Sequence, residues 1–373
     1  MKKILYVHVG TTKTGTTAIQ SFLIDNQEVL NQKGYCYPLF PYRYPDVSER
    51  RNARFLLEEA ADTQNGIFRE GMDKIHELFR TYDKIIVSDE GIWSANYEQR
   101  ITMWRALKAE AKEGGFRIKI IVYLRRQDMY LISGWNQMVK SGIGNSAATP
   151  WKDYVNDLVS INKMKYATHL KKLAAFFGKK NLIVRRFEPK RFTGGSIYAD
   201  FLQAAGLELT DEFQIAQTEK NTRLGGNTHE IQRVLNGMPG MNPALHSFFR
   251  QALLTYADLS GENYPCEMFS KEEAEAFMEQ YQEENREVAE EYFGEEELFD
   301  LSWKDIPKWE KNNPYMQDDL IRFVGACCMR LAEENRELKS RVEWLEKSRE
   351  GLRHPVYTMI KRSRDRKKAD EAR

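Results

Sequence analysis

Hydrophobic residues in the first half of the chain gather in short, nearly continuous runs. Such runs are typical of strands that are buried on both faces of a sheet. Longer stretches with helical spacing lie between them, among them residues 16–32 and 151–178. This alternation predicts a parallel sheet covered by helices on both faces. The strand candidates are ILYVHV (4–9), KIIVSD (84–89), IKIIVYL (118–124) and NLIVRRF (181–187).

From about residue 190 onward the pattern predicts helices alone. GGSIYADFLQAAGL is predicted to be one helix. A second helix begins near residue 227, where Asn227 and Glu230 have the spacing of a capping box. Ser270 and Glu273 form a stronger capping box at the start of a third. Pro307 and Pro314 then mark a connector, so the predicted C-terminal part of the main domain is helical.

A seven-residue repeat of apolar positions begins at Ile321. Leu at position d with one Asn at position a favours a parallel two-stranded coiled coil. The flanking charges agree, since Glu334 would face Lys339 of a second chain and Arg341 would face Glu346. An amphipathic helix packed on its own domain is the alternative. We therefore predict a homodimer through residues 321–352, with Ile321, Cys328, Asn335, Val342 and Arg349 at a, and Val324, Leu331, Leu338, Leu345 and Leu352 at d.

These patterns predict three parts of the chain. Residues 1–312 form the main domain, with a sheet core over about 1–190 and a helical part over about 191–312. Residues 316–352 form the coiled-coil helix. Residues 353–373 are a basic tail, and we expect a solvated, disordered end there rather than a membrane anchor.

Composition narrows the class of protein. The chain has 373 residues, of which 42% are hydrophobic and 12% aromatic, as in an ordinary globular protein. A net charge of +1 gives no argument for nucleic acid, and no apolar run has the length of a membrane span. The four cysteines have the spacing of neither a disulfide framework nor a zinc site. We expect a cytoplasmic protein without a structural metal, with peripheral attachment at the inner membrane surface as the alternative.

The candidate chemistry begins in ILYVHVGTTKTGTTAIQSFL, residues 4–23. A strand, a Gly/Thr loop and a helix start form an anion site, because backbone N–H groups point outward at a helix N-terminus. Gly10 and Gly15 have the spacing of a nucleotide phosphate loop, but Thr16 and Thr17 follow where a kinase has its lysine. The lysine is instead Lys13, inside the loop. We interpret Lys13 as a partner of the bridging oxygen of a 5′-phosphate, where charge develops on a leaving group, without a metal.

A second motif lies in VYLRRQDMYLISGWNQ. A strand ends at Arg125, and Ser133 follows eight residues later on a helix. A guanidinium offers a forked, permanent charge and a hydroxyl a neutral donor, and both kinds of group suit a phosphate. Arg126 remains an alternative to Arg125, because the sequence does not decide which side chain faces the site.

Together these residues resemble the family of sulfotransferases that use 3′-phosphoadenosine 5′-phosphosulfate (PAPS). HVGTTKTGTT is especially similar to the bacterial, glycan-type branch, and LIVRRFEPKRF, ADFLQAAGL and EENREVAEEYFGEEELF extend the resemblance to about residues 4–300. The resemblance implies a P-loop-like α/β fold, PAPS as sulfuryl donor, its 3′,5′-bisphosphate (PAP) as product, and no metal. It also implies Arg125 and Ser133 at the 3′-phosphate, and a donor-binding loop made of Thr12, Lys13, Thr14, Gly15, Thr16 and Thr17.

Transfer to a hydroxyl needs a general base. Glycan-modifying members of this family commonly use a Glu, and here a predicted strand ends in VSDEGIW. Parallel strands gather ligands at their carboxyl ends, so Glu90 is the first candidate and Asp89 the second. His8, in the middle of a strand, is interpreted as a core residue. The Arg-Lys-Gly motif of the cytosolic branch is missing, and EKNTRLGGN (219–227) is a hypothetical substitute for it.

The predicted function is therefore transfer of a sulfuryl group from PAPS to a hydroxyl, by in-line displacement with Lys13 and Glu90 as catalytic residues. By resemblance alone, the acceptor is a carbohydrate. A P-loop kinase and a non-catalytic nucleotide-binding scaffold are the alternatives.

Overall fold

A computed structural model describes most of the chain: residues 3–45, 47–61, 66–216, 225–260, 266–303, 306–353 and 359–365. The chain divides into two compact units. Unit 1 consists of residues 1–141, 149–221 and 266–309, and unit 2 of residues 142–148, 222–265 and 310–373.

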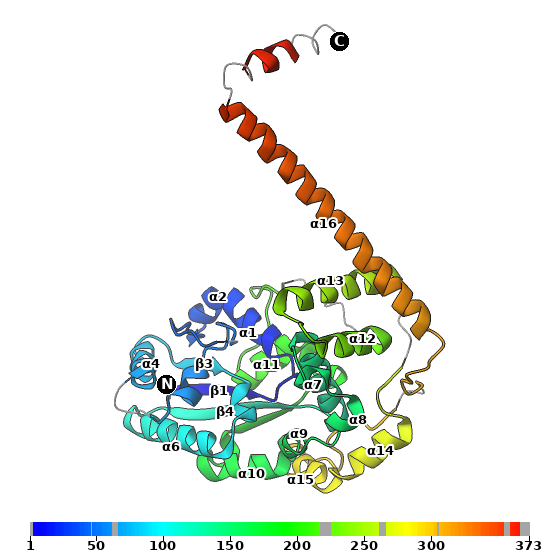
Figure 1. Cartoon of the computed structure of the whole chain (residues 1–373). Helices are drawn as coiled ribbons and strands as arrows, with labels where there is room; N and C mark the ends of the chain where they lie inside the picture. The colour runs from blue at the N-terminus through cyan, green and yellow to red at the C-terminus, as the bar shows by residue number, and fades with distance from the viewer. Residues whose placement is uncertain are drawn as a thin grey trace. The chain divides into compact units, whose positions relative to one another are not determined.

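Unit 1 is built around a five-stranded parallel sheet with the strand order β2-β3-β1-β4-β5 (Figure 1). The four predicted strands are confirmed. The fifth, β2, was not predicted, because two residues are too few to show a pattern. The strands are β1 (Ile4–Gly10), β2 (Tyr35–Cys36), β3 (Lys84–Ser88), β4 (Arg117–Leu124) and β5 (Leu182–Arg186).

Successive residues of the strands face opposite sides of the sheet, and each side is buried. In β1, Leu5 and Val7 belong to one apolar core, whereas Tyr6 belongs to the other. The first core is completed by α3 (Arg54–Glu58), α4 (Gly66–Leu78), α6 (Tyr97–Glu113), α10 (Tyr166–Phe177) and α15 (Gln282–Phe293), and the second by α1 (Thr16–Asp25), α2 (Gln27–Gln32) and α11 (Ile197–Ala205). The predicted fold class, a parallel sheet flanked by helices with a helical C-terminal part, is confirmed.

The long predicted helices of unit 1 are divided in the structure. Residues 16–32 form α1 and α2, and residues 151–178 form α8 (Trp151–Tyr154), α9 (Leu158–Lys163) and α10. The remaining helices are α5 (Gly91–Ser94), α7 (Gln127–Ser141) and α14 (Lys271–Glu279). The capping box of α14 is confirmed, because the Ser270 hydroxyl accepts from the Glu273 N–H at 3.2 Å and the Glu273 carboxylate accepts from the Ser270 N–H at 2.9 Å.

Unit 2 contains α12 (Gly226–Asn236), α13 (Pro243–Ser260) and α16 (Met316–Arg353). The capping box predicted for α12 is wrong. The helix begins at Gly226, with Gly225 at the N-cap and Thr228 at the third position. The Asn227 amide instead donates to Asp319 at 2.7 Å, because both side chains are buried and each needs a polar partner.

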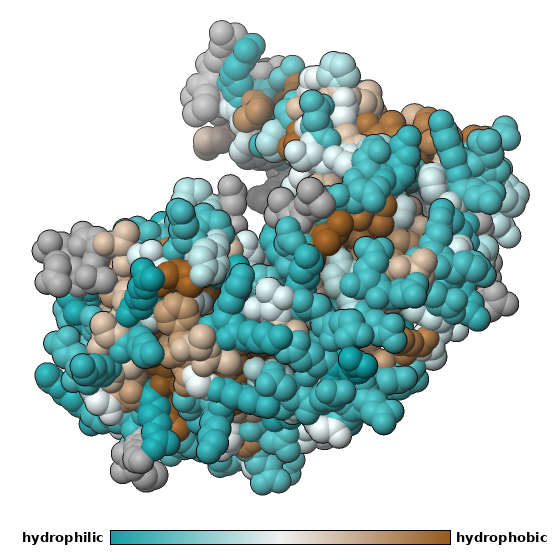
Figure 2. All heavy atoms as spheres, turned by 90° about the horizontal axis from the view of Figure 1, so that it is seen from below, coloured by the Kyte–Doolittle hydropathy of each residue, from teal (hydrophilic) through white to brown (hydrophobic). Residues whose placement is uncertain are grey.

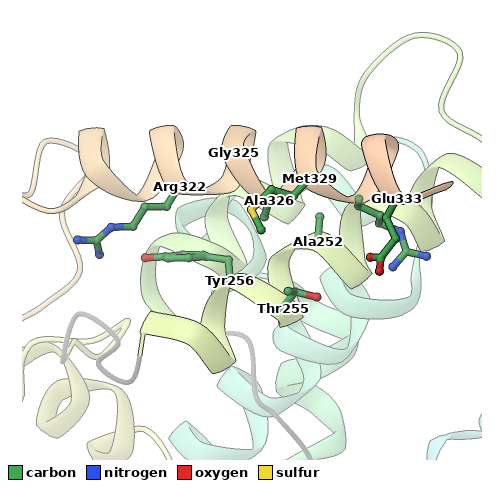
Figure 3. Close-up of a pocket in the computed structure, with 9 residues that line it drawn as sticks. Ala252, Thr255, Tyr256, Arg322, Gly325, Ala326, Met329 and Glu333 are labelled. Carbon is green, nitrogen blue, oxygen red and sulfur yellow. The ribbon is translucent and has the colours of Figure 1, made fainter. Parts of the chain in front are cut away.

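A pocket of about 510 Å³ lies between α13 and α16 (Figure 3). Ala252 of α13 and Ala326 and Met329 of α16 contribute apolar groups to its lining. Most of the surface visible in Figure 2 is hydrophilic, with small hydrophobic areas between. Within the part of the chain that the structure describes, no helix is both long enough and apolar enough to cross a bilayer.

Candidate functional site

Three neighbouring strands of unit 1 bring the predicted site residues to one edge of the sheet. β1 lies between β3 and β4, and all run parallel, so their carboxyl ends lie at the same edge. The loop 11–15 follows β1, Asp89 and Glu90 follow β3, and Arg125 follows β4. After β1 the chain forms the two strands on one side of it, β2 and β3, and then the two on the other side, β4 and β5. Open α/β sheets bind ligands at the carboxyl ends of the strands where the strand order reverses in this way.

The backbone of the loop has a conformation that favours glycine. Gly10 and Gly15 have φ of 84° and 74°, and Lys13 has φ of 65°, the only positive φ at a residue other than glycine in the described ranges. A left-handed backbone costs about 1–2 kcal/mol at an L-residue such as lysine. Such a conformation persists where the surrounding structure holds it, and residues of this kind cluster at active sites and ligand-binding loops.

Hydrogen bonds to neighbouring elements fix the loop. The Thr11 N–H donates to the Tyr123 carbonyl of β4 at 2.9 Å. The Thr14 hydroxyl donates to the Thr11 carbonyl at 2.5 Å, and both threonines are fully buried. The Thr14 hydroxyl thus closes the loop, and its backbone N–H is the group through which Thr14 could bind an anion.

Close packing explains why both glycines are needed. A Cβ at Gly15 would lie 2.5 Å from Ile197 Cδ1, and a Cβ at Gly10 would lie 2.8 Å from the Cβ of Glu90. Real Cβ atoms do not approach other atoms so closely, so a side chain at either position would displace a neighbour. The contact at Gly10 also places Glu90 directly beside the loop.

The start of α1 is suited to an anion. Gly15 is its N-cap, and its first turn contains no acidic residue. The first N–H groups of a helix have no partner within the helix, and the helix dipole favours negative charge there. Thr16 is buried and Thr17 exposed, while the Thr12 hydroxyl donates to the phenol oxygen of Tyr130 at 3.0 Å.

Lys13 is held between two other elements. Its ammonium donates to Gln137 Oε1 on α7 at 2.9 Å, and its carbonyl accepts from the Arg125 guanidinium at 2.7 Å. The Arg125 carbonyl in turn accepts from the Tyr166 hydroxyl at 2.6 Å. The cation of the loop and the arginine at the end of β4 are therefore parts of one network.

One face of α7 fronts the loop. Tyr130 contacts Thr12 and Gln137 contacts Lys13, and residues seven apart share a helix face. Ser133 stands between them at the helical spacing of three and four, so the predicted Ser133 lies on the face of α7 that contacts the loop.

The structure separates the two candidate arginines. Arg126 forms a forked ion pair with Asp128, at 2.8 and 2.9 Å, and also donates to the Asp300 carbonyl at 2.8 Å. Its guanidinium lies 4.3 Å from the centre of the Trp303 ring. Arg126 therefore braces the segment near residue 300, whereas Arg125 contacts the loop.

The two candidate carboxylates differ in environment. Asp89 is fully buried, and its Oδ1 accepts from Arg51 Nε at 3.2 Å and from the Gly91 N–H at 2.6 Å. Burial raises the pKa of Asp89, and the Arg51 guanidinium opposes that shift. The Glu90 side chain is 17% exposed; its Oε2 accepts from Gln20 Nε2 at 3.1 Å and lies 3.6 Å from Arg51 Nε. Of the two carboxylates, Glu90 is the one that is partly exposed.

His8 is part of the core. Its Nδ1 lies 2.9 Å from Ser88 Oγ, and its ring lies 5.2 Å from that of Phe201. Burial lowers the pKa of His8 to about 3, so the imidazole is neutral at physiological pH. This environment agrees with the interpretation of His8 as a core residue.

Sequence reasoning missed several residues of this region. Gln20 and Gln137 each lie four residues after a predicted site residue, Thr16 and Ser133, so helical spacing could have indicated them. Arg51 lies in a segment without periodicity, and no signal pointed to it. The segment 219–224 of the hypothetical adenine-binding stretch lies outside the described residues. Among those described, no group of three or more His, Cys, Asp or Glu side chains could hold a metal ion.

Comparisons with known proteins leave the family open. No protein-family profile matches the chain. An uncharacterized protein of Archaeoglobus fulgidus is 28% identical over 245 residues, which are 64% of this chain and 62% of that protein, so the match spans less than two thirds of the relative.

Three solved sulfotransferase structures resemble this chain at low sequence identity. The sulfotransferase of Alicyclobacillus acidocaldarius has 14% identity and a TM-score of 0.37, covering 58% of this chain and 86% of its own. The sulfotransferase domain of the Synechococcus PCC 7002 olefin synthase has 12% identity and a TM-score of 0.34, covering 71% and 98%. The sulfotransferase domain of the curacin biosynthetic pathway has 13% identity and a TM-score of 0.36, and the match covers 75% of this chain and 97% of that domain.

Proposed function

We propose that this protein is a PAPS-dependent sulfotransferase acting on a hydroxyl group, with a carbohydrate as the first candidate acceptor. One observation carries the proposal. A phosphate-loop backbone holds its lysine inside the loop, at a left-handed residue, with an accessible carboxylate packed against the loop's first glycine. The motifs of residues 10–17 and 125–133 resemble those of sulfotransferases and set the choice of donor.

The donor would lie along the loop and the face of α7. PAPS supplies, when bound, a sulfuryl group on a phosphate that departs as PAP. The N–H groups of residues 12–17 and the hydroxyls of Thr16 and Thr17 would hold the phosphosulfate, and the Lys13 ammonium would neutralise the oxygen that takes up charge. Arg125 and Ser133 would hold the 3′-phosphate.

The acceptor would approach from the side of β3. Glu90 accepts the proton of the attacking hydroxyl as the new O–S bond forms, and the old bond to the 5′-phosphate oxygen breaks on the opposite side. Arg51 and Gln20 hold the Glu90 carboxylate in position. Asp89, fully buried on the Arg51 guanidinium, orients that arginine.

A thermal-shift comparison of nucleotides tests the proposal. PAP should raise the melting temperature in the absence of Mg²⁺, since a ligand at 100 times its Kd stabilises the folded state by about 2.7 kcal/mol. ATP and GTP are the matched ligands. Protection by ATP with Mg²⁺ and none by PAP would support a kinase and refute the sulfotransferase.

An assay of PAP release from PAPS against a panel of hydroxyl compounds then tests catalysis. Release that depends on a saccharide supports the carbohydrate acceptor. Binding of PAP without transfer to any saccharide, phenol, steroid or peptide hydroxyl would favour a nucleotide-binding scaffold.

A further inference from the structure

The helix α16 presents two apolar faces, and its own unit covers one of them. Phe323, at 6% exposure, packs with α12 and α13, and the partly buried Ala326 and Cys327 pack beside it. Figure 3 shows Ala326 on the side of α16 that looks onto α13. In the heptad, Phe323 and Ala326 hold positions c and f, which lie away from the a/d positions, and Cys327 holds position g at their flank.

The second face is exposed. Ile321 is 62% exposed, and the d leucines Leu331, Leu338 and Leu345 are 49%, 57% and 58% exposed. Figure 1 shows the C-terminal half of α16 continuing past α12 and α13. Large apolar side chains at regular heptad spacing, on a helix whose remaining exposed residues are mostly polar, indicate an association surface. We call this face the seam: Ile321, Cys328, Asn335 and Val342 at a, and Val324, Leu331, Leu338 and Leu345 at d.

We propose that the seam pairs with the seam of a second copy of this chain, as a parallel, in-register two-stranded coiled coil over residues 321–348. This span makes about four heptads, a length at which a heptad pattern is a meaningful signal. The proposal goes beyond sulfuryl transfer and does not depend on it.

Charge complementarity favours a second copy as the partner. In a parallel pair each g residue faces the next e residue of the other chain. Glu334 then lies opposite Lys339 of the partner subunit, and Arg341 lies opposite Glu346 of the partner subunit. Every such charged pair joins opposite signs.

The single polar residue of the seam sets the orientation. In register, Asn335 meets the partner's Asn335, and two amides can satisfy each other. Within one chain the Asn335 amide donates to the Leu331 carbonyl at 3.1 Å, and its oxygen can accept from the partner. In an antiparallel pair, a residues meet d residues, so the amide would be buried against leucine at the cost of an unsatisfied polar group.

The first experiment measures the mass of the full chain in solution. Sedimentation equilibrium at micromolar concentration should give twice 43.7 kDa. Leu338→Glu should give 43.7 kDa, because a carboxylate would enter an apolar layer. Trp344→Glu is the matched control: Trp344 is 68% exposed but lies at position c, so the dimer should persist.

The second experiment uses a native cysteine to test orientation and register. Cys328 is exposed and occupies an a position, so only a parallel, in-register pair brings it opposite the partner's Cys328. Mild oxidation should give a covalent dimer on a non-reducing gel. Cys328→Ser should abolish this dimer and Cys327→Ser should leave it, since Cys327 lies at g.

The outcomes separate the possibilities. A monomeric native chain, or equal mass for Leu338→Glu and the native protein, overturns the proposal and leaves the seam to a different protein. A dimer without Cys328 crosslinking overturns the parallel register. A native chain that is dimeric but does not bind PAP would count against the proposed sulfotransferase function and would leave the proposed dimer unaffected.

Discussion

The edge of the sheet in unit 1 and the seam of α16 in unit 2 are two opposite kinds of surface. At the sheet edge, side chains from separate parts of the sequence complete one another, as when Gln137 of α7 accepts from Lys13. On the seam, apolar side chains remain largely exposed, as Leu338 does at 57%. The comparison indicates that one folded chain can supply hydrogen-bond partners for the polar groups of a site, whereas a regular exposed apolar face needs a second surface to cover it.

The largest expected effect is on the carboxylate of the sheet edge. Glu90→Gln keeps the shape and removes the basicity, so kcat should fall by about 10²–10⁴-fold with little change in affinity for PAP. Steady-state kinetics with PAPS and a saccharide acceptor would measure it. If Asp89→Asn lowers kcat in this way and Glu90→Gln does not, the base is Asp89.

The two faces of α16 can be compared through stability. Phe323→Ala should lower the free energy of unfolding of unit 2 by about 3–5 kcal/mol, because a buried ring is lost. Leu338→Ala should change the stability of the single chain little, since the leucine is exposed there. Urea unfolding followed by circular dichroism, at concentrations where the chain is monomeric, measures both. Equal losses would mean that the seam is covered within its own chain.

Removing the Lys13 ammonium tests the proposed catalytic role of the loop at the sheet edge. Lys13→Ala should reduce kcat by about 10²–10³-fold, the usual effect of losing one charge-stabilising donor, and leave the melting temperature unchanged. Lys13→Gly is the control, since it also lacks the ammonium but suits the left-handed backbone. Unchanged turnover in either variant would remove Lys13 from the mechanism.

The two adjacent arginines should separate binding from folding. Arg125→Ala should weaken PAP binding by about 1.5–3 kcal/mol, the usual contribution of a hydrogen bond to a charged group, without changing acceptor KM. Arg126→Ala should lower thermal stability and leave PAP affinity unchanged, because its ion pair is with Asp128. Isothermal titration with PAP tests both. The reverse result would assign the 3′-phosphate to Arg126.

The smallest effect, taken over a single pH unit, is a pH dependence under the sheet edge. The pKa of His8 is lowered from 6.5 to about 3 by burial, so below about pH 6.5 the unfolded chain binds a proton that the folded chain refuses. Stability should therefore fall as pH drops from 6.5 toward 3, by at most about 1.4 kcal/mol per pH unit from this group. His8→Asn should flatten this slope in urea unfolding at several pH values, and an unchanged slope would contradict the assignment.

Measurements over a similar pH range also test the proposed dimer through the seam of α16. α16 contains no histidine, so the mass of the dimer should not change between pH 7.5 and 5.5. Dissociation in that range would point to an interface that involves residues outside the seam.

The sequence predicted what depends on local spacing. Continuous apolar runs gave the four long strands, and Ser270 with Glu273 gave a helix start, because neighbours in sequence make those structures. It failed at α12, where Asn227 turns toward Asp319, a residue distant in sequence. Tertiary partners decide such cases, and local preferences cannot reveal them.

The residues of the candidate site divide in the same way, into those that local motifs predict and those that only tertiary contacts reveal. Lys13 was predicted from the loop motif, Arg125 from the Arg/Ser spacing that resembles sulfotransferases, and Glu90 because it follows a parallel strand. Arg51 was missed, since its contact with Asp89 exists only after residues 38 positions apart meet. The preference for Arg125 over Arg126 likewise depends on the bonds that Arg126 makes near residue 300.

The left-handed backbone at Lys13 has a consequence for selection in the laboratory. Glycine and asparagine occupy this conformation more readily than lysine, so a library screened only for heat resistance should enrich them at position 13. Variants selected in that screen would be more stable but would lack the Lys13 ammonium. A library screened for the proposed sulfuryl transfer should keep lysine there, and the divergence between the two screens would show how much folding stability the proposed activity costs.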